Sequence, residues 1–173
     1  MSTTCAVTDS AILLATFSVN EGMFAIDASR IQEIIRPRAM TRVPHACGAI
    51  MGVINLRGRI VTIFDTARLL ADGVGAFDTI TPGPENRIII VNSQSEFVGL
   101  MVERVTEVLE AEAGTAEPAP ANMGTDRALL FSEVYRVHGR VVALLNTDAV
   151  LASEAASRGQ RGVTNEPSRP RCG

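Results

Sequence analysis

The chain has 173 residues, 46% of them hydrophobic, and its 16 basic and 19 acidic residues give a formal charge of −3. This length accommodates one sizeable domain or two small ones packed together. Every basic residue is an arginine, and neither their number nor any long basic run indicates a nucleic-acid-binding surface. No apolar run approaches the roughly 20 residues that a membrane-spanning helix needs, so we expect no direct membrane insertion.

The start of the chain and its cysteines indicate a cytoplasmic protein. Residues 1–10 lack the basic start and the long apolar segment of a signal peptide, and we expect them to form a flexible leader. The three cysteines are widely spaced, which argues against a framework of disulfides.

The first half of the chain contains five predicted strands, because short runs rich in β-branched and aromatic residues alternate with turn residues. A helical turn is expected at 28–30, a loop at 38–48, and a surface linker at 71–85, where glycine and proline accumulate. The predicted strands lie at 12–19, 23–27, 31–36, 53–56 and 60–64.

The stretch from Gly52 to Leu70 organises this half, and its pattern predicts a strand, a tight turn, a second strand and a short helix. The turn falls at Arg57-Gly58, where glycine reaches backbone angles that a Cβ atom would block. Asp65 or Thr66 is placed to cap the helix. Arg57 is a charged residue at a hairpin tip among apolar neighbours, a position that is most often only solvated.

The second half repeats this order of elements. A loop rich in alanine, proline and glutamate is expected at 110–126 and a second short helix at 146–152. The tail at 153–173 is polar, carries four arginines against two glutamates, and is expected to be disordered. The predicted strands of this half lie at 87–92, 97–102, 105–109, 129–137 and 141–145.

The two halves are weakly similar in sequence. Residues 58–61 match 139–142 at a shift of 81, and 31–35 match 105–109 at a shift of 74. Five short strands in each half suit a small barrel, so we expect two five-stranded barrels packed face to face. The predicted domain spans 11–152, divided at about residue 85 into subdomains 11–85 and 86–152. At the position of Arg57 the second half has His138, so the arginine is not required by the hairpin itself.

Candidate catalytic groups are few. His45 lies two residues before Cys47, and a Cys–His nucleophile pair would need an orienting acid and oxyanion donors that do not accompany them. A metal site needs three or four convergent ligands, and these two residues supply two at most. We expect no metal, no cofactor and no catalytic activity. A small-ligand-binding or Cys/His-dependent enzyme barrel remains the alternative.

Several phrases of the chain together resemble the CheW family, the chemotaxis coupling proteins, over about residues 11–152. The most specific is Gly52-Val-Ile-Asn-Leu-Arg-Gly58 followed by the helix start at Asp65. The other matching phrases are the first strand-turn-strand with Phe17, Gly22 and Ile26, and the segments 31–34, 43–44, 98–102, 105–109 and 139–145.

This resemblance implies an all-β fold of two small five-stranded Src-homology-3-like barrels around a shared hydrophobic core. It implies a non-catalytic adaptor that couples transmembrane chemoreceptors to a CheA-type histidine kinase in a signalling array. The expected partners are the receptor's cytoplasmic domain, the kinase's regulatory domain and other CheW-like domains in array rings. The protein would then be cytoplasmic and peripheral to the inner membrane.

The resemblance also assigns residues. Glu33 and Arg57 look like the family's ion pair at the receptor groove. Three positions depart from the family's pattern: Thr62 stands where proline is frequent, Asn146 where aspartate is frequent, and Gly48 where a bulkier residue is frequent. The implied receptor-binding residues are Ile31, Glu33, Arg57, Ile60, Val102 and Val105, and the implied structural motif is Gly52, Asn55, Leu56, Gly58 and Asp65.

Overall fold

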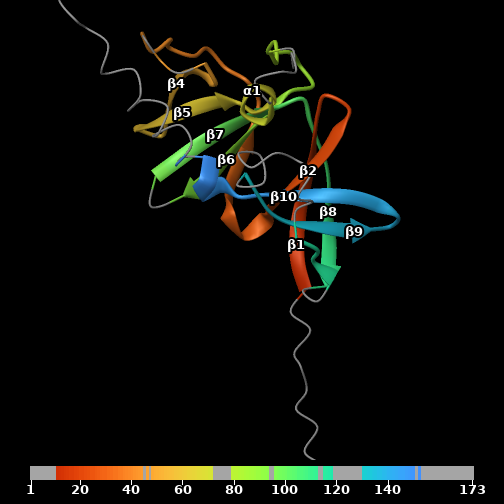
Figure 1. Ribbon diagram of the computed structural model, residues 1–173. Helices are drawn as coiled ribbons and strands as arrows, with labels where there is room; N and C mark the ends of the chain where they lie inside the picture. The colour runs from red at the N-terminus through yellow and green to blue at the C-terminus, as the bar shows by residue number, and fades with distance from the viewer. Residues whose placement is uncertain are drawn as a thin grey trace, which may run out of the picture.

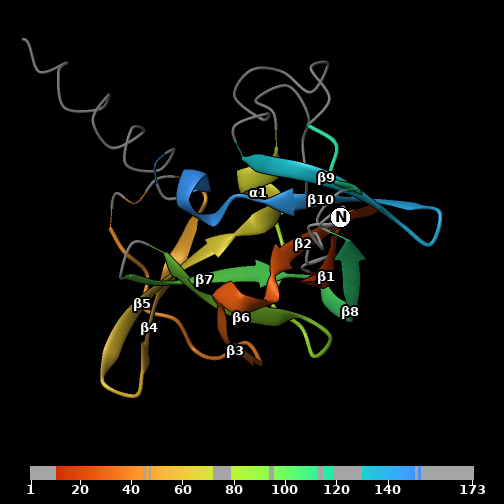
Figure 2. The same ribbon diagram turned by 90° about the horizontal axis from the view of Figure 1, so that it is seen from below.

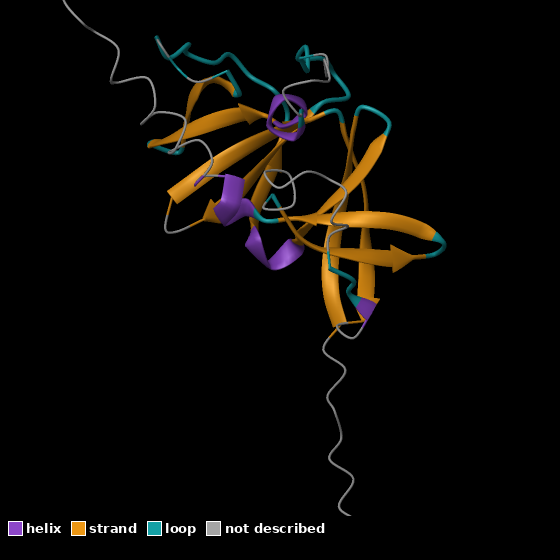
Figure 3. Cartoon of the chain, in the orientation of Figure 1, coloured by secondary structure: helices purple, strands orange, loops and turns teal. Residues whose placement is uncertain are grey.

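The computed structural model describes residues 11–44, 46, 48–71, 79–93, 96–112, 115–118, 130–150 and 152. Within these ranges the chain is mostly β-structure with a few short helices (Figure 1, Figure 3). The predicted leader at 1–10 and the predicted tail at 153–173 lie outside the described residues.

The strands form where the sequence predicts them, with shifted ends. The helices are η1 (Ala28–Arg30) and α1 (Thr66–Leu70), and residues 147–150 are also helical. The strands are β1 (Ala11–Val19), β2 (Gly22–Asp27), β3 (Ile31–Ile35), β4 (Ile50–Leu56), β5 (Arg59–Asp65), β6 (Arg87–Ser93), β7 (Glu96–Val102), β8 (Arg104–Glu112), β9 (Phe131–Val137) and β10 (Arg140–Leu145).

The largest shift is in β8, which continues to Glu112, so the predicted loop at 110–126 begins too early. β1 pairs with β8 along its length, from Ser18 opposite Arg104 to Ala11 opposite Glu112. Glutamate and alanine are weak strand formers, but a complete partner strand satisfies their backbone groups and overrides that preference.

The strands form two five-stranded sheets, which we call unit A and unit B. Unit A has the order β8-β1-β2-β10-β9, and unit B has the order β3-β6-β7-β5-β4. Figure 1 shows unit A at the lower right and unit B at the upper left. The predicted division into subdomains 11–85 and 86–152 is therefore wrong, because unit A takes strands from both ends of the chain.

The sequence repeat has a physical counterpart in this topology. Adding five to each strand number of unit B, and subtracting ten where the sum exceeds ten, reproduces the order of unit A. Each half contributes its first hairpin to one unit and its other three strands to the other unit. The parallel pairs β5–β7 and β10–β2 join the halves within each unit. Neither half of the chain therefore contains all five strands of one sheet.

The units match the predicted small-barrel fold, although hydrogen bonds between the described strands do not close either sheet. β8 and β9 are the edges of unit A, and β3 and β4 those of unit B. Within the described residues, an isolated β-bridge pairs with each of the edge strands β4 and β9. The bridges join Thr41 to Val53 and Glu117 to Val134, and Val53 and Val134 are matching positions of the repeat.

Most of the core is shared between the two units. Phe17 and Ile26 of unit A belong to the same buried cluster as Phe64 and Leu100 of unit B. Burying one such side chain contributes about 1.5–3 kcal/mol, so this common cluster holds the units together as one packed body. A smaller cluster that includes fully buried Tyr135 fills unit A.

A polar junction links the units where η1 carries the chain from one to the other. An Arg30 guanidinium nitrogen lies 3.0 Å from a carboxylate oxygen of Asp148, in the helix that follows β10. The Ser93 hydroxyl, at the end of β6, donates to the other oxygen of Asp148. The Ser93 hydrogen bond, followed by Arg30, lowers the pKa of Asp148 below its usual value.

Candidate functional site

The phrase Asn55-Leu56-Arg57-Gly58 forms the tip of the β4–β5 hairpin. Arg57 has φ +52° and Gly58 has φ +84°, the pair of positive angles that a two-residue type I′ turn requires. The Asn55 side-chain oxygen accepts a hydrogen bond from the Gly58 amide at 2.8 Å, and Leu56 is buried. Asparagine, leucine and glycine in this phrase therefore build the turn.

The predicted pair of Glu33 and Arg57 is present. An Arg57 guanidinium nitrogen donates to a carboxylate oxygen of Glu33 at 3.3 Å, across the gap between β3 and the hairpin tip. The Arg57 side chain is 79% exposed and that of Glu33 is 23% exposed. Figure 2 shows the hairpin projecting from unit B on the side of β3. Arg57 is thus largely available to a partner, while Glu33 holds one side of it.

The other predicted contact residues do not all share this surface. Ile60 is 67% exposed on β5, and Ile31 is half-buried on β3. Val105 is half-buried on β8 and packs against the shared core. Val102, also implied as a receptor contact, is fully buried, so its side chain offers no surface to a partner in this structure. Val102 pairs with Arg87, at the opposite end of β6 from the partner of Ile31.

A groove of about 340 Å³ lies beside the Glu33–Arg57 pair. Arg59 and Phe97 are among the lining residues that the sequence did not single out. The guanidinium carbon of Arg59 lies 4.8 Å from the centre of the Phe97 ring, a cation–π contact. The Arg-Gly-Arg pattern around the turn was a usable signal for Arg59. Phe97 comes from β7, and only the tertiary structure brings it here. The groove is lined by Gln32, Glu33, Leu56, Arg57, Arg59, Val61, Ile90 and Phe97.

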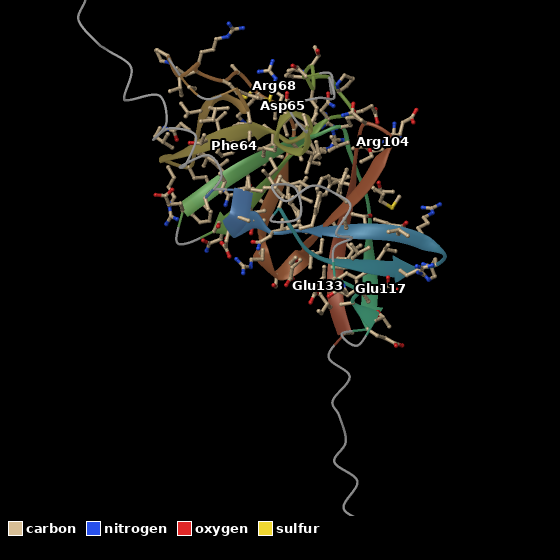
Figure 4. All side chains as sticks on the ribbon, in the orientation of Figure 1. Phe64, Asp65, Arg68, Arg104, Glu117 and Glu133 are labelled. Atoms are coloured by element: carbon tan, nitrogen blue, oxygen red, sulfur yellow. The ribbon has the colours of Figure 1, made fainter. Side chains whose placement is uncertain are left out.

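Asp65 has a structural role at the start of α1. Its carboxylate accepts hydrogen bonds from the amides of Ala67 and Arg68, at 3.0 and 3.4 Å, and of Ile80 at 3.2 Å. The side chain is buried, and this burial raises its pKa above the usual value despite those hydrogen bonds. Of the two candidate caps, Asp65 is the one used, and Figure 4 shows it with Arg68 beside α1.

Asn146 caps the second helix as Asp65 caps the first. Its side-chain oxygen accepts from the amides of Asp148 and Ala149, each at 3.1 Å. An amide oxygen performs the same capping as a carboxylate oxygen, so the departure at Asn146 leaves the local fold intact.

A second hollow, of about 590 Å³, lies beside α1 and shares no lining residue with the groove. It combines apolar side chains with two cations. Arg68 is held there by the Thr79 hydroxyl at 2.9 Å, while Arg42 makes no hydrogen bond or ion pair with the other described residues. The hollow is lined by Met40, Arg42, Val43, Ala46, Gly48, Ile50, Met51, Asp65, Arg68, Thr79 and Pro82.

His45 and Cys47, the residues of the alternative enzyme site, lie outside the described residues. Among the residues that are described, no three of His, Cys, Asp and Glu are grouped as metal ligands. The same part of the chain contains no helix long and apolar enough to cross a membrane.

Known proteins resemble this chain over most of its length. The CheW-like domain family model matches residues 14–155. The chemotaxis protein CheW of Rhizobium meliloti (strain 1021) is 32% identical over 143 residues, covering 82% of this chain and 88% of that protein. CheW of Bacillus subtilis (strain 168) is 28% identical, covering 83% and 88%.

One solved structure supports the fold. The scaffolding protein TtCheW from Thermoanaerobacter tengcongensis superposes with a TM-score of 0.72 at 22% identity, covering 86% of this chain and 93% of that one. These comparisons give no support to the enzyme alternative. The chain belongs to the CheW family of chemotaxis proteins, and its role is that of a non-catalytic scaffold.

Proposed function

We propose that this protein couples chemoreceptors, the methyl-accepting chemotaxis proteins, to a CheA-type histidine kinase. The observation that carries the proposal is the Glu33–Arg57 pair, which presents a largely exposed guanidinium at the rim of a groove. Arginine recognises carboxylates through a planar fork and also packs against apolar surface, so it suits a protein contact.

The receptor binds at the groove side of unit B in this proposal. Ile60 supplies exposed apolar area on the hairpin, and Ile31 adds a half-buried contact on β3. Val105 stays a proposed contact of lower weight, because it is half-buried on β8 and packs against the core.

The kinase's regulatory domain binds at the hollow beside α1 in the same proposal. An adaptor that holds two partners at once needs two surfaces that do not overlap, and the groove and the hollow have no residue in common. Val43, 40% exposed, provides apolar area there, and Arg42, which has no ion pair within the described part of the chain, provides charge. Other CheW-like domains in array rings are further partners, and the protein acts in the cytoplasm next to the inner membrane.

Reconstitution tests this proposal. Receptor-containing membranes and the kinase are mixed with or without this protein, and kinase autophosphorylation is measured. Receptor control of the kinase should require all three components. Equal control without this protein would contradict the proposal.

Two variants separate the surfaces in pairwise binding measurements. Val43→Asp places a charge in the hollow and should weaken kinase binding only, whereas Arg57→Ala should weaken receptor binding only. The reverse pattern would exchange the two assignments. Arg104→Ala is the matched control, because this exposed arginine lines neither surface and pairs with Glu85 at 3.6 Å.

A further inference from the structure

Arg59 is the arginine of the groove whose guanidinium has no polar partner among the described residues, whereas Arg57 has Glu33. Its guanidinium lies over the Phe97 ring, and it makes no hydrogen bond or ion pair with the other described residues. Stacking on a ring leaves the N–H donors of a guanidinium free at its edge and restricts the side chain's motion. The N–H donors of the Arg59 guanidinium are therefore held in one orientation and have no acceptor among the described residues.

The repeat supplies a comparison within the same molecule. Arg140 occupies the position of Arg59 in unit A, but it already faces a carboxylate of its own chain, with Glu107 at 3.8 Å. The aromatic counterpart of Phe97 is Phe24, which stacks on Phe131 with ring centres 5.7 Å apart. Among the described residues, the arginine of unit B is stacked on an aromatic ring and has no acidic partner, whereas that of unit A has one.

The groove also has more cations than anions. Arg57 and Arg59 line it, and Glu33 is the one carboxylate among the lining residues, already engaged by Arg57. Its remaining wall is apolar except for Gln32 and is formed by Leu56, Val61, Ile90 and Phe97. Such a site is electrostatically incomplete, and a carboxylate from a partner would balance it.

Resting on the proposed receptor contact, we infer that Arg59 binds a carboxylate of the receptor segment that enters this groove. Phe97 orients the guanidinium for that contact, and Arg57 with Glu33 borders it. Arg59 thereby selects receptor segments that carry an acidic residue beside an apolar one.

The test measures the affinity of the full chain for the cytoplasmic signalling fragment of a chemoreceptor from the same genome, at several salt concentrations. Arg59→Gln should weaken binding by between roughly tenfold and a hundredfold, the range for a lost charge-assisted hydrogen bond. It should also reduce the salt dependence of the affinity. Arg140→Gln removes the same charge at the matching position of unit A, and should change the affinity less than about twofold, as exposed paired charges do.

A second measurement identifies the acidic partner. Acidic residues of the receptor fragment are neutralised one at a time, and one of these variants should lose no further affinity when combined with Arg59→Gln. Phe97→Leu keeps apolar volume but removes the ring, and should give a smaller loss than Arg59→Gln.

The outcomes distinguish this inference from the proposed function. If the natural chain binds the receptor fragment and Arg59→Gln binds equally well, or retains the full salt dependence, the inference is wrong and the coupling role stands. If the natural chain does not bind the receptor fragment at all, the coupling role fails together with the inference.

Discussion

Arg57 combines an unfavourable backbone with an exposed side chain. A non-glycine residue at φ +52° is disfavoured by about 1–2 kcal/mol relative to the right-handed region. The matching residue of the other hairpin, His138, has φ +49°, so the strain belongs to the type I′ turn in both units. At this turn position the two hairpins differ in the side chain, a guanidinium in one and an imidazole in the other. This difference favours the use of Arg57 by a partner.

Arg57→Ala should therefore separate stability from binding. The exposed ion pair is worth about 0–1 kcal/mol, so the melting temperature should hardly change. Truncating one member of a charge pair that becomes buried on binding costs on the order of 2–5 kcal/mol, so receptor affinity should fall steeply. Calorimetry and a binding titration check both outcomes. Arg57→Lys should recover only part of the affinity, because an ammonium lacks the planar fork.

Unfolding of the Arg57→Ala variant, or unchanged receptor binding and kinase coupling, would contradict this prediction. Exchanging the two charges, Glu33→Arg with Arg57→Glu, distinguishes pairing from direct contact. Recovered binding would indicate that each residue orients the other, and continued loss that Arg57 touches the receptor.

Asp65 makes stability depend on pH in a defined direction. Its pKa in the folded protein is raised above the usual 3.8, so the folded state binds this proton more tightly than the unfolded state. As the pH falls through the folded pKa to below 3.8, this group's contribution to the free energy of unfolding rises, and it is lost again as the pH rises.

Denaturant unfolding over that pH range checks this direction. The free energy of unfolding of the natural chain minus that of Asp65→Asn should increase as the pH falls, because other carboxyl groups cancel in the difference. Asp148→Asn is the matched comparison with opposite sign, since the pKa of Asp148 is lowered and its contribution is lost as the pH falls through that pKa. A difference for Asp65 that decreases with acid would contradict this assignment.

Among the elements, β4 depends on a close approach that only glycine allows. The backbone of Val53 exchanges two hydrogen bonds with that of Thr41, at 2.8 and 2.9 Å. A Cβ atom at Gly52 would lie 2.7 Å from the Thr41 carbonyl oxygen, which is closer than real Cβ contacts come. This bridge covers the outer edge of β4 and brings the loop that begins at Arg36 against unit B.

Gly52→Ala should destabilise the protein by roughly 1–3 kcal/mol, because backbone rather than a flexible side chain must move. Gly48→Ala is the control, since a Cβ atom there meets no other atom within 4 Å and the change should stay within about 0.5 kcal/mol. Chemical denaturation of both variants checks the contrast. Equal stabilities would show that β4 does not depend on this approach.

At the scale of the whole molecule, the halves are interlocked by exchange of their first hairpins. Unit A needs β8–β10 from the second half, and unit B needs β6 and β7 from it. The shared core crosses the same boundary, and Arg30, Ser93 and Asp148 connect segments from both halves. If one half folded alone, its strands would therefore have unpaired edges and its apolar side chains would remain exposed to water.

The fragments 11–85 and 86–152 should accordingly fail to fold in isolation, with no cooperative thermal transition and poor dispersion of amide NMR signals. Mixing the two should restore a transition if they find each other before aggregating, because together they supply every strand. Cooperative unfolding of either fragment alone would contradict the interlocked description.

Local patterns in the chain were enough for the strands, the turn at Arg57-Gly58 and a helix cap at Asp65 or Thr66, and the family resemblance supplied the ion pair of Glu33 and Arg57. These features depend on alternation, turn chemistry and motif identity, which are written in neighbouring residues. Strand partners are not, because the pairing of β1 with β8 joins residues about 90 positions apart and any apolar strand could serve. Hence the assignment of strands to the two sheets, the burial of Val102 and the contact between Arg59 and Phe97 were decided by tertiary structure alone, because the exchange of the hairpins determines which surfaces meet and which remain open.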